Sequence, residues 1–499
     1  MSDSAAQLDP TDQPAGPAAI IDRSSAICVI GAGPAGLATA RALRARGLDY
    51  DQLERNTGVG GLWDIDAPGT PMYEAAHFIS SKTLSGFSEF PMSESFPDYP
   101  SHRQVLSYLR DFAAAYGLNE SIEFGVSVES VTKSADGSWL VTRSDGVQTR
   151  YRSVVCCSGA QWIPNLPATP GSFTGEVMHS LSYRDLDQVR GKRVLVVGGG
   201  NSACDIVVDA GRVAERAVIS MRRGYWFIPK HIFGVPADVF AENGPSLPRR
   251  LEQRVFGTLL NLIYGKPERL GLQRPDHKLF ETHPVLNSNL FLSLQHGDVT
   301  PKPGIQTTEG STVTFVDGSS EDFDLIIYAT GYLHSVPYAR EYFGNDQHPD
   351  LYLTCFSREH EGLFGVGFTE TNSGAYVHFD AFGQMIANYL DDQDHNPERA
   401  RQFAALVATD RPDLSGGIRF DRSPRHKGYV DAHALIKYRD SIVTRLGWQT
   451  RVEPAPGVTG QVPASAVSAP ASVPTSVPTS VPASAPDSLP ETESQTVTS

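Results

Sequence analysis

Short apolar runs that end in glycine-rich turns dominate the pattern of hydrophobic and polar positions along this chain. Residues 26–30 (AICVI) lead into a turn at 31–36, and residues 194–197 (VLVV) lead into a second turn at 198–203. Uninterrupted apolar runs of this length are typical of buried strands in a parallel sheet, and helix-forming residues follow each turn. The pattern therefore predicts two separate units of strand, turn and helix.

The first unit carries every feature of a dinucleotide site. Its turn fits the pattern GxGxxG, in which glycines allow a tight turn and close approach of a pyrophosphate, and the helix N-terminus binds phosphate. Glu54 ends the next predicted strand, where an acid accepts the hydroxyls of a ribose. We predict that this unit binds a dinucleotide. Its candidate residues are Gly31, Ala32, Gly33, Pro34, Ala35, Gly36 and Glu54.

The second unit differs from the first at two positions. Its third glycine is replaced by Ala203, and Met221-Arg222-Arg223 follows the next apolar run where the first unit has its acid. A cation there favours the 2′-phosphate of NADP, although an arginine pair at a solvated loop end is the alternative interpretation. We predict an NADP site. Its candidate residues are Gly198, Gly200, Asn201, Ser202, Ala203, Cys204, Asp205, Ser220, Arg222 and Arg223.

Two further strands that end in glycine, at 153–159 and 325–331, mark the predicted crossings between domains. The fold class expected is α/β, with two Rossmann-like dinucleotide-binding domains and the NADP domain inserted into the domain of the first unit. We assign residues 25–165 and 326–450 to this first domain, and 166–325 to the NADP domain with an insertion at about 225–301. Residues 363–368 should form a closing strand, followed by a helix that holds Gln384 and Met385. The first 24 residues and the Pro/Ser/Ala-rich residues 452–499 are predicted to be disordered.

Composition narrows the class of protein. The 499-residue chain has a net charge of −15, so it offers no basic stripe for nucleic acid. Its five cysteines are scattered through predicted strands and helices without a CxxC pair, which disfavours a flavin–disulfide reductase and suggests core residues in a reducing compartment. No metal cluster is predicted. Residues 1–19 lack a secretory signal and no apolar run reaches 18 residues, so a cytoplasmic protein without an integral membrane segment is expected.

Several further segments resemble the flavin-containing monooxygenase family, a group of class B flavoprotein monooxygenases. Glu54-Arg55 with Gly60-Gly61-Leu62-Trp63 resembles the family's flavin-ring segment, and residues 73–82 with 90–91 and 96–100 resemble its substrate-side stretch. Phe173-x-Gly175-x-x-x-His179-x-x-x-Tyr183-Arg184 is similar to the fingerprint FxGxxxHxxx(Y/F)(K/R). The resemblance covers most of residues 25–390. It adds Arg55, Gly61, Leu62 and Trp63 to the candidate cofactor residues.

The resemblance implies FAD and NADPH as cofactors and O2 and a small organic molecule as substrates. FAD would be held by the first unit, so the interrupted domain, 25–165 and 326–450, would be the FAD domain and the inserted domain the NADP domain. NADPH would reduce FAD, and a flavin C4a-hydroperoxide would transfer one oxygen atom. Baeyer–Villiger enzymes usually carry Trp at the position of Tyr183, and a GGTW segment where this chain has Gly60-Gly61-Leu62-Trp63. Both differences favour N- or S-oxygenation. Ile79 stands where N-oxygenating members often place an asparagine, and it cannot donate that hydrogen bond. Baeyer–Villiger oxidation of ketones, or an NADPH oxidase or dehydrogenase without oxygen transfer, therefore remain alternatives.

The candidate catalytic residues are Ser80, Ser81, Lys82 and His179. The two serines could replace the missing amide donor or be ordinary loop hydroxyls, and Lys82 could lie near phosphate or flavin or be solvated. His179 is expected to orient the linker between the domains. The insertion is expected to shape the substrate channel, with an amphipathic helix touching a membrane as the alternative. The sequence leaves the oligomeric state open, a homo-oligomer included.

Overall fold

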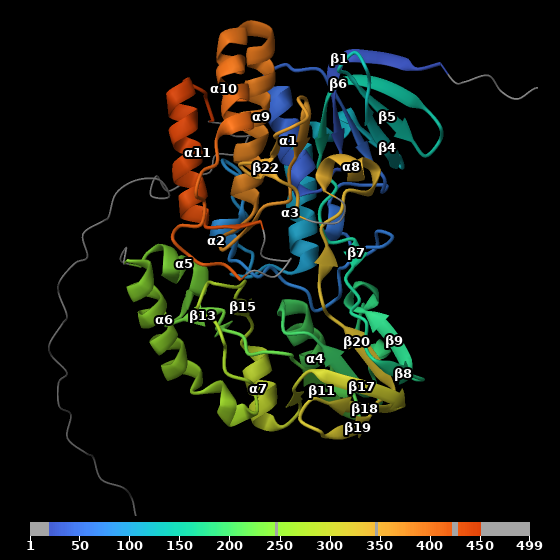
Figure 1. Cartoon of the computed structure of the whole chain (residues 1–499), viewed down its shortest axis with the longest axis vertical. Coiled ribbons are helices and arrows are strands. Elements are labelled where there is room, and N and C mark those ends of the chain that lie inside the picture. The colour runs from blue at the N-terminus through green and yellow to red at the C-terminus, as the bar shows by residue number, and fades with distance from the viewer. Residues whose placement is uncertain (1–18, 245–247, 345–347, 422–427, 451–499) are drawn as a thin grey trace, which may run out of the picture. The chain divides into compact units, whose positions relative to one another are not determined.

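The first of two parallel sheets is built on strand β1 (Ile21–Ile30). The computed structural model (Figure 1) describes residues 19–244, 248–344, 348–421 and 428–450. β1 pairs in parallel with a strand on either side, and the closing strand 363–365 joins the same sheet from far along the chain. The strand order is β22 (Leu351–Tyr352), β23 (Phe356–Ser357), β24 (Leu363–Gly365), β6 (Gln148–Cys156), β1, β2 (Tyr50–Glu54), β3 (Ile122–Phe124), with β4 (Val128–Lys133) and β5 (Trp139–Arg143) joined through β6.

The second sheet contains five strands that are all parallel. Its order is β16 (Thr300–Lys302), β11 (Arg216–Ser220), β10 (Arg193–Val197), β20 (Leu325–Tyr328), β9 (Glu176–His179). A smaller four-stranded sheet packs beside it, and Phe315 and Phe323 are fully buried in the shared core. That sheet comprises β19 (Ser320–Asp322), β18 (Thr312–Phe315), β17 (Ile305–Gly310) and β8 (Gly171–Phe173).

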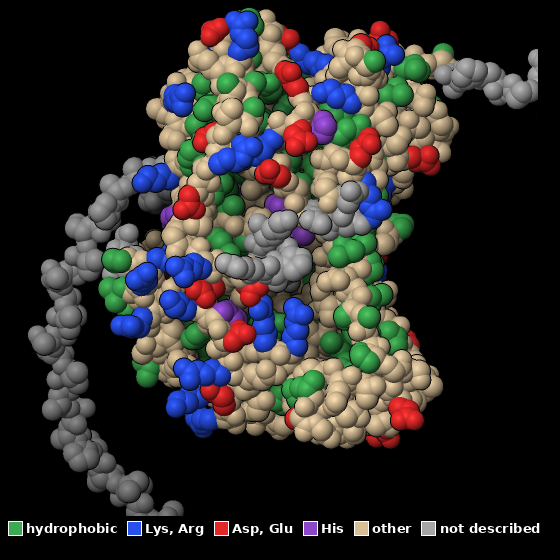
Figure 2. All heavy atoms as spheres, viewed as in Figure 1, with side chains coloured by type: hydrophobic (Ala, Val, Ile, Leu, Met, Phe, Trp, Pro, Cys, Tyr) green, Lys and Arg blue, Asp and Glu red, His purple; other side chains and the backbone are tan. Residues whose placement is uncertain are grey.

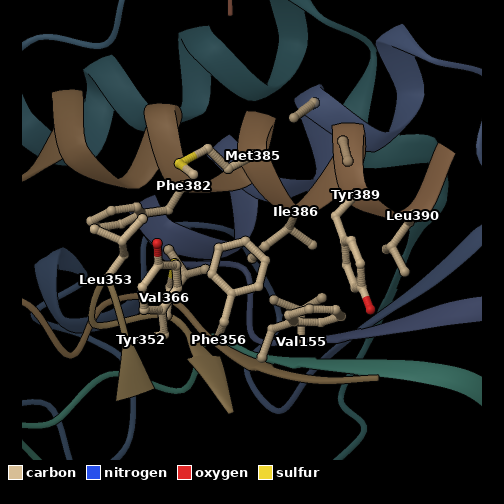
Figure 3. Packing of buried hydrophobic residues seen from close by; sticks show 14 of the residues in the cluster. Val155, Tyr352, Leu353, Phe356, Val366, Phe382, Met385, Ile386, Tyr389 and Leu390 are labelled. Atoms are coloured by element: carbon tan, nitrogen blue, oxygen red, sulfur yellow. The ribbon is translucent and has the colours of Figure 1, made fainter. Parts of the chain in front are cut away.

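Helix α9 (Tyr376–His395) contacts both the helix that follows the first glycine turn and the edge strands of the first sheet. It packs so closely on α1 (Pro34–Ala45) that a side chain on Gly383 would lie 3.0 Å from the Cα of Thr39. Its other face covers β22 and β23, where Phe382, Met385 and Ile386 are fully buried (Figure 3). The remaining helices around this sheet are α2 (Lys82–Ser85), α3 (His102–Ala115), α8 (Arg340–Phe343), α10 (Pro397–Thr409) and α11 (Ala432–Leu446).

The insertion is a helical subdomain added between β11 and β16. It consists of α5 (Ala237–Glu242), α6 (Arg249–Tyr264) and α7 (Asn289–His296), and α7 packs against α4 (Asn201–Val213) of the second unit. Two pairs of two-residue strands brace it: β12 (Phe227–Ile228) with β15 (Val285–Leu286), and β13 (His231–Ile232) with β14 (Val235–Pro236). Elsewhere β7 (Ile163–Pro164) pairs with β21 (Tyr332–Leu333), and β25 (Glu370–Thr371) with β26 (Tyr429–Val430).

Most of the predicted strands and helices are present, but two boundaries differ. The predicted closing strand forms as β24, and Gln384 and Met385 lie in α9. Residues 21–24 are strand rather than disordered tail, because β1 continues along β6 past a register shift and Arg23 forms ion pairs with Asp49 and Asp51. Residues 325–328 belong to the second sheet, so the second crossing follows them. Residues 1–18 and 452–499, predicted to be disordered, lie outside the described residues.

All five cysteines are buried and free, as expected for core residues. Burial raises the pKa of the Cys156 and Cys157 thiols, which keeps this adjacent pair protonated. Among the residues that the structure describes, no helix is both long and apolar enough to cross a membrane.

Candidate functional site

The first glycine turn joins β1 to α1 and has no room for a side chain at Gly31 or Gly36. Gly31 adopts φ +107°, and a Cβ there would lie 2.6 Å from the carbonyl oxygen of Cys157 at the end of β6. A Cβ on Gly36 would lie 2.0 Å from the carbonyl oxygen of Gly31. Helix α1 begins after Gly33 without a side-chain cap, so its first N–H groups are available to an anion. These features fit a bound pyrophosphate.

Glu54 lies at the end of β2 and faces this turn. Its Oε2 accepts a hydrogen bond from the backbone N–H of Ala32 at 2.6 Å, and its Oε1 accepts one from Asn56 at 2.8 Å. Burial raises the pKa of this carboxyl group, although the backbone donors oppose the shift. A carboxylate has about four acceptor sites, so capacity remains for ribose hydroxyls. The next residue, Arg55, stacks over Trp162 with 4.0 Å to the ring centroid.

The segment Gly61-Leu62-Trp63 packs directly on the first turn. A Cβ on Gly33 would lie 3.4 Å from the Cα of Gly61, so two glycines from different segments are in close contact. Trp63 then packs on Phe78 with ring centroids 4.7 Å apart, and Phe78 contacts Tyr376 of α9 at 5.5 Å. The flavin-ring segment suggested by the sequence therefore lies beside the first turn and ends in an aromatic wall.

The second turn repeats the geometry of the first. Gly198 adopts φ +143°, and its Cβ would lie 2.3 Å from the carbonyl oxygen of Ala329 at the end of β20. Helix α4 begins after Gly200 without a side-chain cap, and a Cβ on Gly200 would meet no atom within 4 Å. Ala203 and Cys204 are fully buried in the core behind the turn. Each turn thus lies beside the glycine-ended strand that the sequence identified as a crossing.

The two arginines after β11 differ in their surroundings. Arg222 is exposed, beside Gly304, and makes no ion pair among the described residues. Arg223 forms an ion pair with Asp421 at 2.7 Å. The hydroxyl of Ser220 donates to the carbonyl oxygen of Pro303 at 2.8 Å. Arg222 is therefore the residue of this group that is available to a phosphate.

Asp205 joins three segments behind the second turn. The hydroxyl of Tyr73 donates to its Oδ2 at 2.9 Å, and Nδ2 of Asn287 in the insertion donates to its Oδ1 at 2.7 Å. Nearby, Oδ1 of Asn201 accepts from the backbone of Leu286 at 2.9 Å. Burial raises the pKa of Asp205 to about 6. No sequence motif indicated this junction, because its partners are distant in the chain.

The pKa of Asp205 predicts a pH-dependent stability. An acid whose pKa is higher in the folded state binds more protons when folded, so its contribution is greatest below the unfolded pKa of 3.8 and is lost as pH rises through about 6. We expect Asp205→Asn to remove this loss, which amounts to about 2–3 kcal/mol between pH 4 and pH 7. Urea unfolding of both proteins across that range measures it. Parallel pH profiles for wild type and variant would contradict the assignment.

The structure gives each candidate catalytic side chain a defined environment. The hydroxyl of Ser80 accepts a hydrogen bond from Ser85 at 2.7 Å, whereas that of Ser81 is buried and makes no hydrogen bond to the described residues. The ammonium of Lys82 donates to the carbonyl oxygens of Glu94 and Phe96. These contacts fasten the loop at 93–96 and leave Ser81 as the hydroxyl without a partner.

His179 lies at the crossing between the two sheets. Its Nδ1 accepts from the backbone N–H of Leu181 at 3.1 Å, so Nε2 carries the proton and donates to the carbonyl oxygen of Gly331 at 3.0 Å. Burial lowers the pKa of the ring, which keeps it neutral. Both nitrogens are used to hold the linker, in keeping with the orienting role expected from the sequence.

The fold and the two turns define a class: proteins with paired dinucleotide-binding domains, one interrupted by the other. Residues 24–363 match the family of flavin-binding monooxygenase-like proteins. The chain is 34% identical over 338 residues to dimethylaniline monooxygenase [N-oxide-forming] 2 of Oryctolagus cuniculus, and the match covers 63% of each chain. It is 32% identical over 450 residues to flavin-containing monooxygenase 3 of Macaca mulatta, covering 84% of this chain and 82% of that protein. The chain belongs to the flavin-binding monooxygenase-like family, as the sequence motifs indicated.

A solved structure agrees on the fold. Steroid monooxygenase bound to NADP superimposes with a TM-score of 0.64 at 18% identity, covering 86% of this chain and 99% of that one. This chain therefore shares with this more distant protein an α/β architecture that has two Rossmann-like domains.

Proposed function

We propose that this protein is an NADPH- and FAD-dependent monooxygenase that oxygenates the nitrogen or sulfur of small organic molecules. The proposal rests on two uncapped helix N-termini at glycine turns. One lies beside the buried acid Glu54, and the other lies beside the end of β11, two residues before Arg222, which makes no ion pair among the described residues. FAD would be held at the first turn and NADPH at the second. When bound there, the two cofactors would supply the reducing power and the activation of O2 from which the transferred oxygen atom comes.

The chain's own residues would bind the cofactors, orient them and exclude water. Gly33 and Gly61 leave space beside the first turn, and Trp63, Phe78 and Tyr376 form an apolar wall next to it. An apolar wall limits the access of water, which would protect a reactive intermediate from unproductive decay. The unpartnered hydroxyl of Ser81 could supply the donor that Ile79 lacks.

The insertion is proposed to form part of the substrate channel, because it contacts the substrate-side stretch. The backbone N–H of Ser81 donates to Oδ2 of Asp238 in α5 at 2.6 Å, and α5 packs on α2. The hydroxyl of Tyr99 bonds to the carbonyl oxygen of Lys230, and Oδ2 of Asp98 lies 2.9 Å from Nε2 of His231. These contacts tie the start of the insertion to residues 81–99.

Asp238→Ala tests this role. Loss of the hydrogen bond to Ser81 should loosen the substrate-side loop, because a bond to a charged acceptor contributes about 1.5–3 kcal/mol. We expect kcat/KM for a bulky sulfide to change at least about fivefold relative to that for dimethyl sulfide, while the rate of flavin reduction by NADPH stays within twofold. Unchanged substrate preference would show that the insertion does not form part of the substrate channel.

The function itself is tested with purified holoenzyme, NADPH and 18O2. Thioanisole, dimethylaniline and cyclohexanone are offered separately, and the products are analysed by mass spectrometry. One 18O atom in the sulfoxide or the N-oxide supports the proposal, whereas labelled lactone from the ketone indicates a Baeyer–Villiger enzyme. NADPH consumption that yields only hydrogen peroxide would identify an oxidase instead.

A further inference from the structure

A cavity of about 540 Å³ lies inside the insertion. One side is formed by α6 and another by residues 265–279, and the walls include Trp226, Tyr264 and Phe291. The volume is in the range of sites for small organic ligands, which is about 300–1,000 Å³. Every residue that lines it falls between 225 and 291, so the insertion alone builds this cavity.

The lining is strongly basic in an otherwise acidic protein. Five cationic side chains contribute to it against a single carboxylate, Glu268, while the whole chain has a net charge of −15. None of the five makes an ion pair within the described residues, whereas their neighbour Arg249 pairs with Glu252 and Asp431. Figure 2 shows Lys and Arg side chains gathered over the α6 part of the surface. The five are Arg250, Arg254, Lys266, Arg274 and Lys278.

The apolar part of the cavity consists of fixed aromatic rings. Tyr264 stacks on Phe291 with centroids 4.1 Å apart and an angle of 19° between the planes. The indole N–H of Trp226 donates to the carbonyl oxygen of His277 at 2.8 Å, and a Cβ on Gly257 of α6 would lie 3.4 Å from the same ring. Rings held in this way present flat faces at little cost in conformational entropy, so they suit a flat apolar ligand.

This cavity is separate from the proposed NADPH site. Neither Arg222 nor any residue of the turn at 198–203 lines it. The two are neighbours, however, because Tyr225 contributes to the cavity and its ring occupies the space that a side chain on Gly199 would need. A ligand in the cavity would therefore lie next to the second turn without replacing its phosphate contacts.

We propose that the cavity is a second binding site, for a flat organic anion such as an aromatic carboxylate. The unpaired guanidinium and ammonium groups would bind the carboxylate through charge-assisted hydrogen bonds, and the aromatic rings would receive the planar apolar body. The site does not depend on flavin chemistry, so it can be tested by binding alone.

Isothermal titration of the holoenzyme with naphthalene-2-carboxylate tests the site, and naphthalene-2-methanol serves as the uncharged ligand of similar shape. We expect the alcohol to bind at least tenfold more weakly, because it cannot form charge-assisted bonds. Arg250→Gln and Arg254→Gln should each weaken binding of the carboxylate about tenfold. Both side chains are exposed, and retained flavin content verifies that the variants fold.

Two control variants distinguish this cavity from the other cationic positions of the chain. Arg269→Gln removes an exposed cation of the insertion that does not line the cavity, and it should leave binding unchanged. Arg222→Gln should also leave it unchanged. Loss of binding in Arg222→Gln alone would place the anion at the NADPH phosphate site and overturn the proposal. Absence of binding, or equal binding of acid and alcohol, would overturn it as well.

Discussion

Gly33→Val is expected to yield a colourless protein, whereas Gly200→Val is expected to stay yellow and lose its response to NADPH. The two glycines occupy the same position in the two turns, immediately before α1 and α4. Their φ angles are −76° and −87°, which any residue can adopt, so valine does not strain either backbone. Valine would occupy the space in which a pyrophosphate approaches each helix N-terminus, and at Gly33 it would also contact Gly61, whose Cα lies 3.4 Å from a Cβ there.

The two variants control for each other. Flavin content is measured from the ratio of absorbance at 450 nm and 280 nm, and the bleaching rate of the flavin under anaerobic NADPH measures the second site. We expect at least a tenfold fall in flavin content for Gly33→Val and a similar fall in bleaching rate at limiting NADPH for Gly200→Val. A yellow Gly33→Val protein would show that FAD does not bind at the first turn. Normal bleaching in Gly200→Val would show that NADPH does not bind at the second.

The sequence predicted the local features of these sites because short-range rules determine them. A buried strand, a glycine turn and a helix can be recognised from about fifteen residues, and Glu54 was found by counting forward from the turn. The strands at 153–159 and 325–331 were also informative, since their carbonyl groups at Cys157 and Ala329 lie against Gly31 and Gly198. Each turn needs a glycine because the end of the neighbouring crossing strand leaves no space for a side chain there.

Features that depend on tertiary contacts were not predicted. The strand at 21–24 reads as polar tail, and its pairing with β6 and the ion pairs of Arg23 involve residues far along the chain. Asp205 was assigned to the NADP site, and its contacts were not predicted because Tyr73 and Asn287 reach it from opposite directions in sequence. Lys82 illustrates the same point, since the carbonyl oxygens that hold it belong to Glu94 and Phe96, 12 and 14 residues further along the chain.

Arg222→Ala is expected to weaken NADPH binding by about ten- to a hundredfold and to leave NADH binding within twofold. A guanidinium that binds a phosphate contributes about 1.5–3 kcal/mol, and NADH lacks the phosphate. Arg222 is exposed and unpaired among the described residues, so the variant breaks no ion pair of the fold. Apparent KM values for NADPH and NADH, measured from flavin reduction under anaerobic conditions, give the preference of wild type and variant for NADPH over NADH.

Arg223→Ala is the matched control. Arg223 already pairs with Asp421 at 2.7 Å, in a half-buried position, so its removal should lower the free energy of unfolding by about 1 kcal/mol and change the preference for NADPH over NADH little. The opposite result, with discrimination lost in Arg223→Ala and retained in Arg222→Ala, would mean that the ion pair with Asp421 opens when the nucleotide binds. In that case Asp421 would compete with the 2′-phosphate for one guanidinium, and its replacement by Asn should tighten NADPH binding.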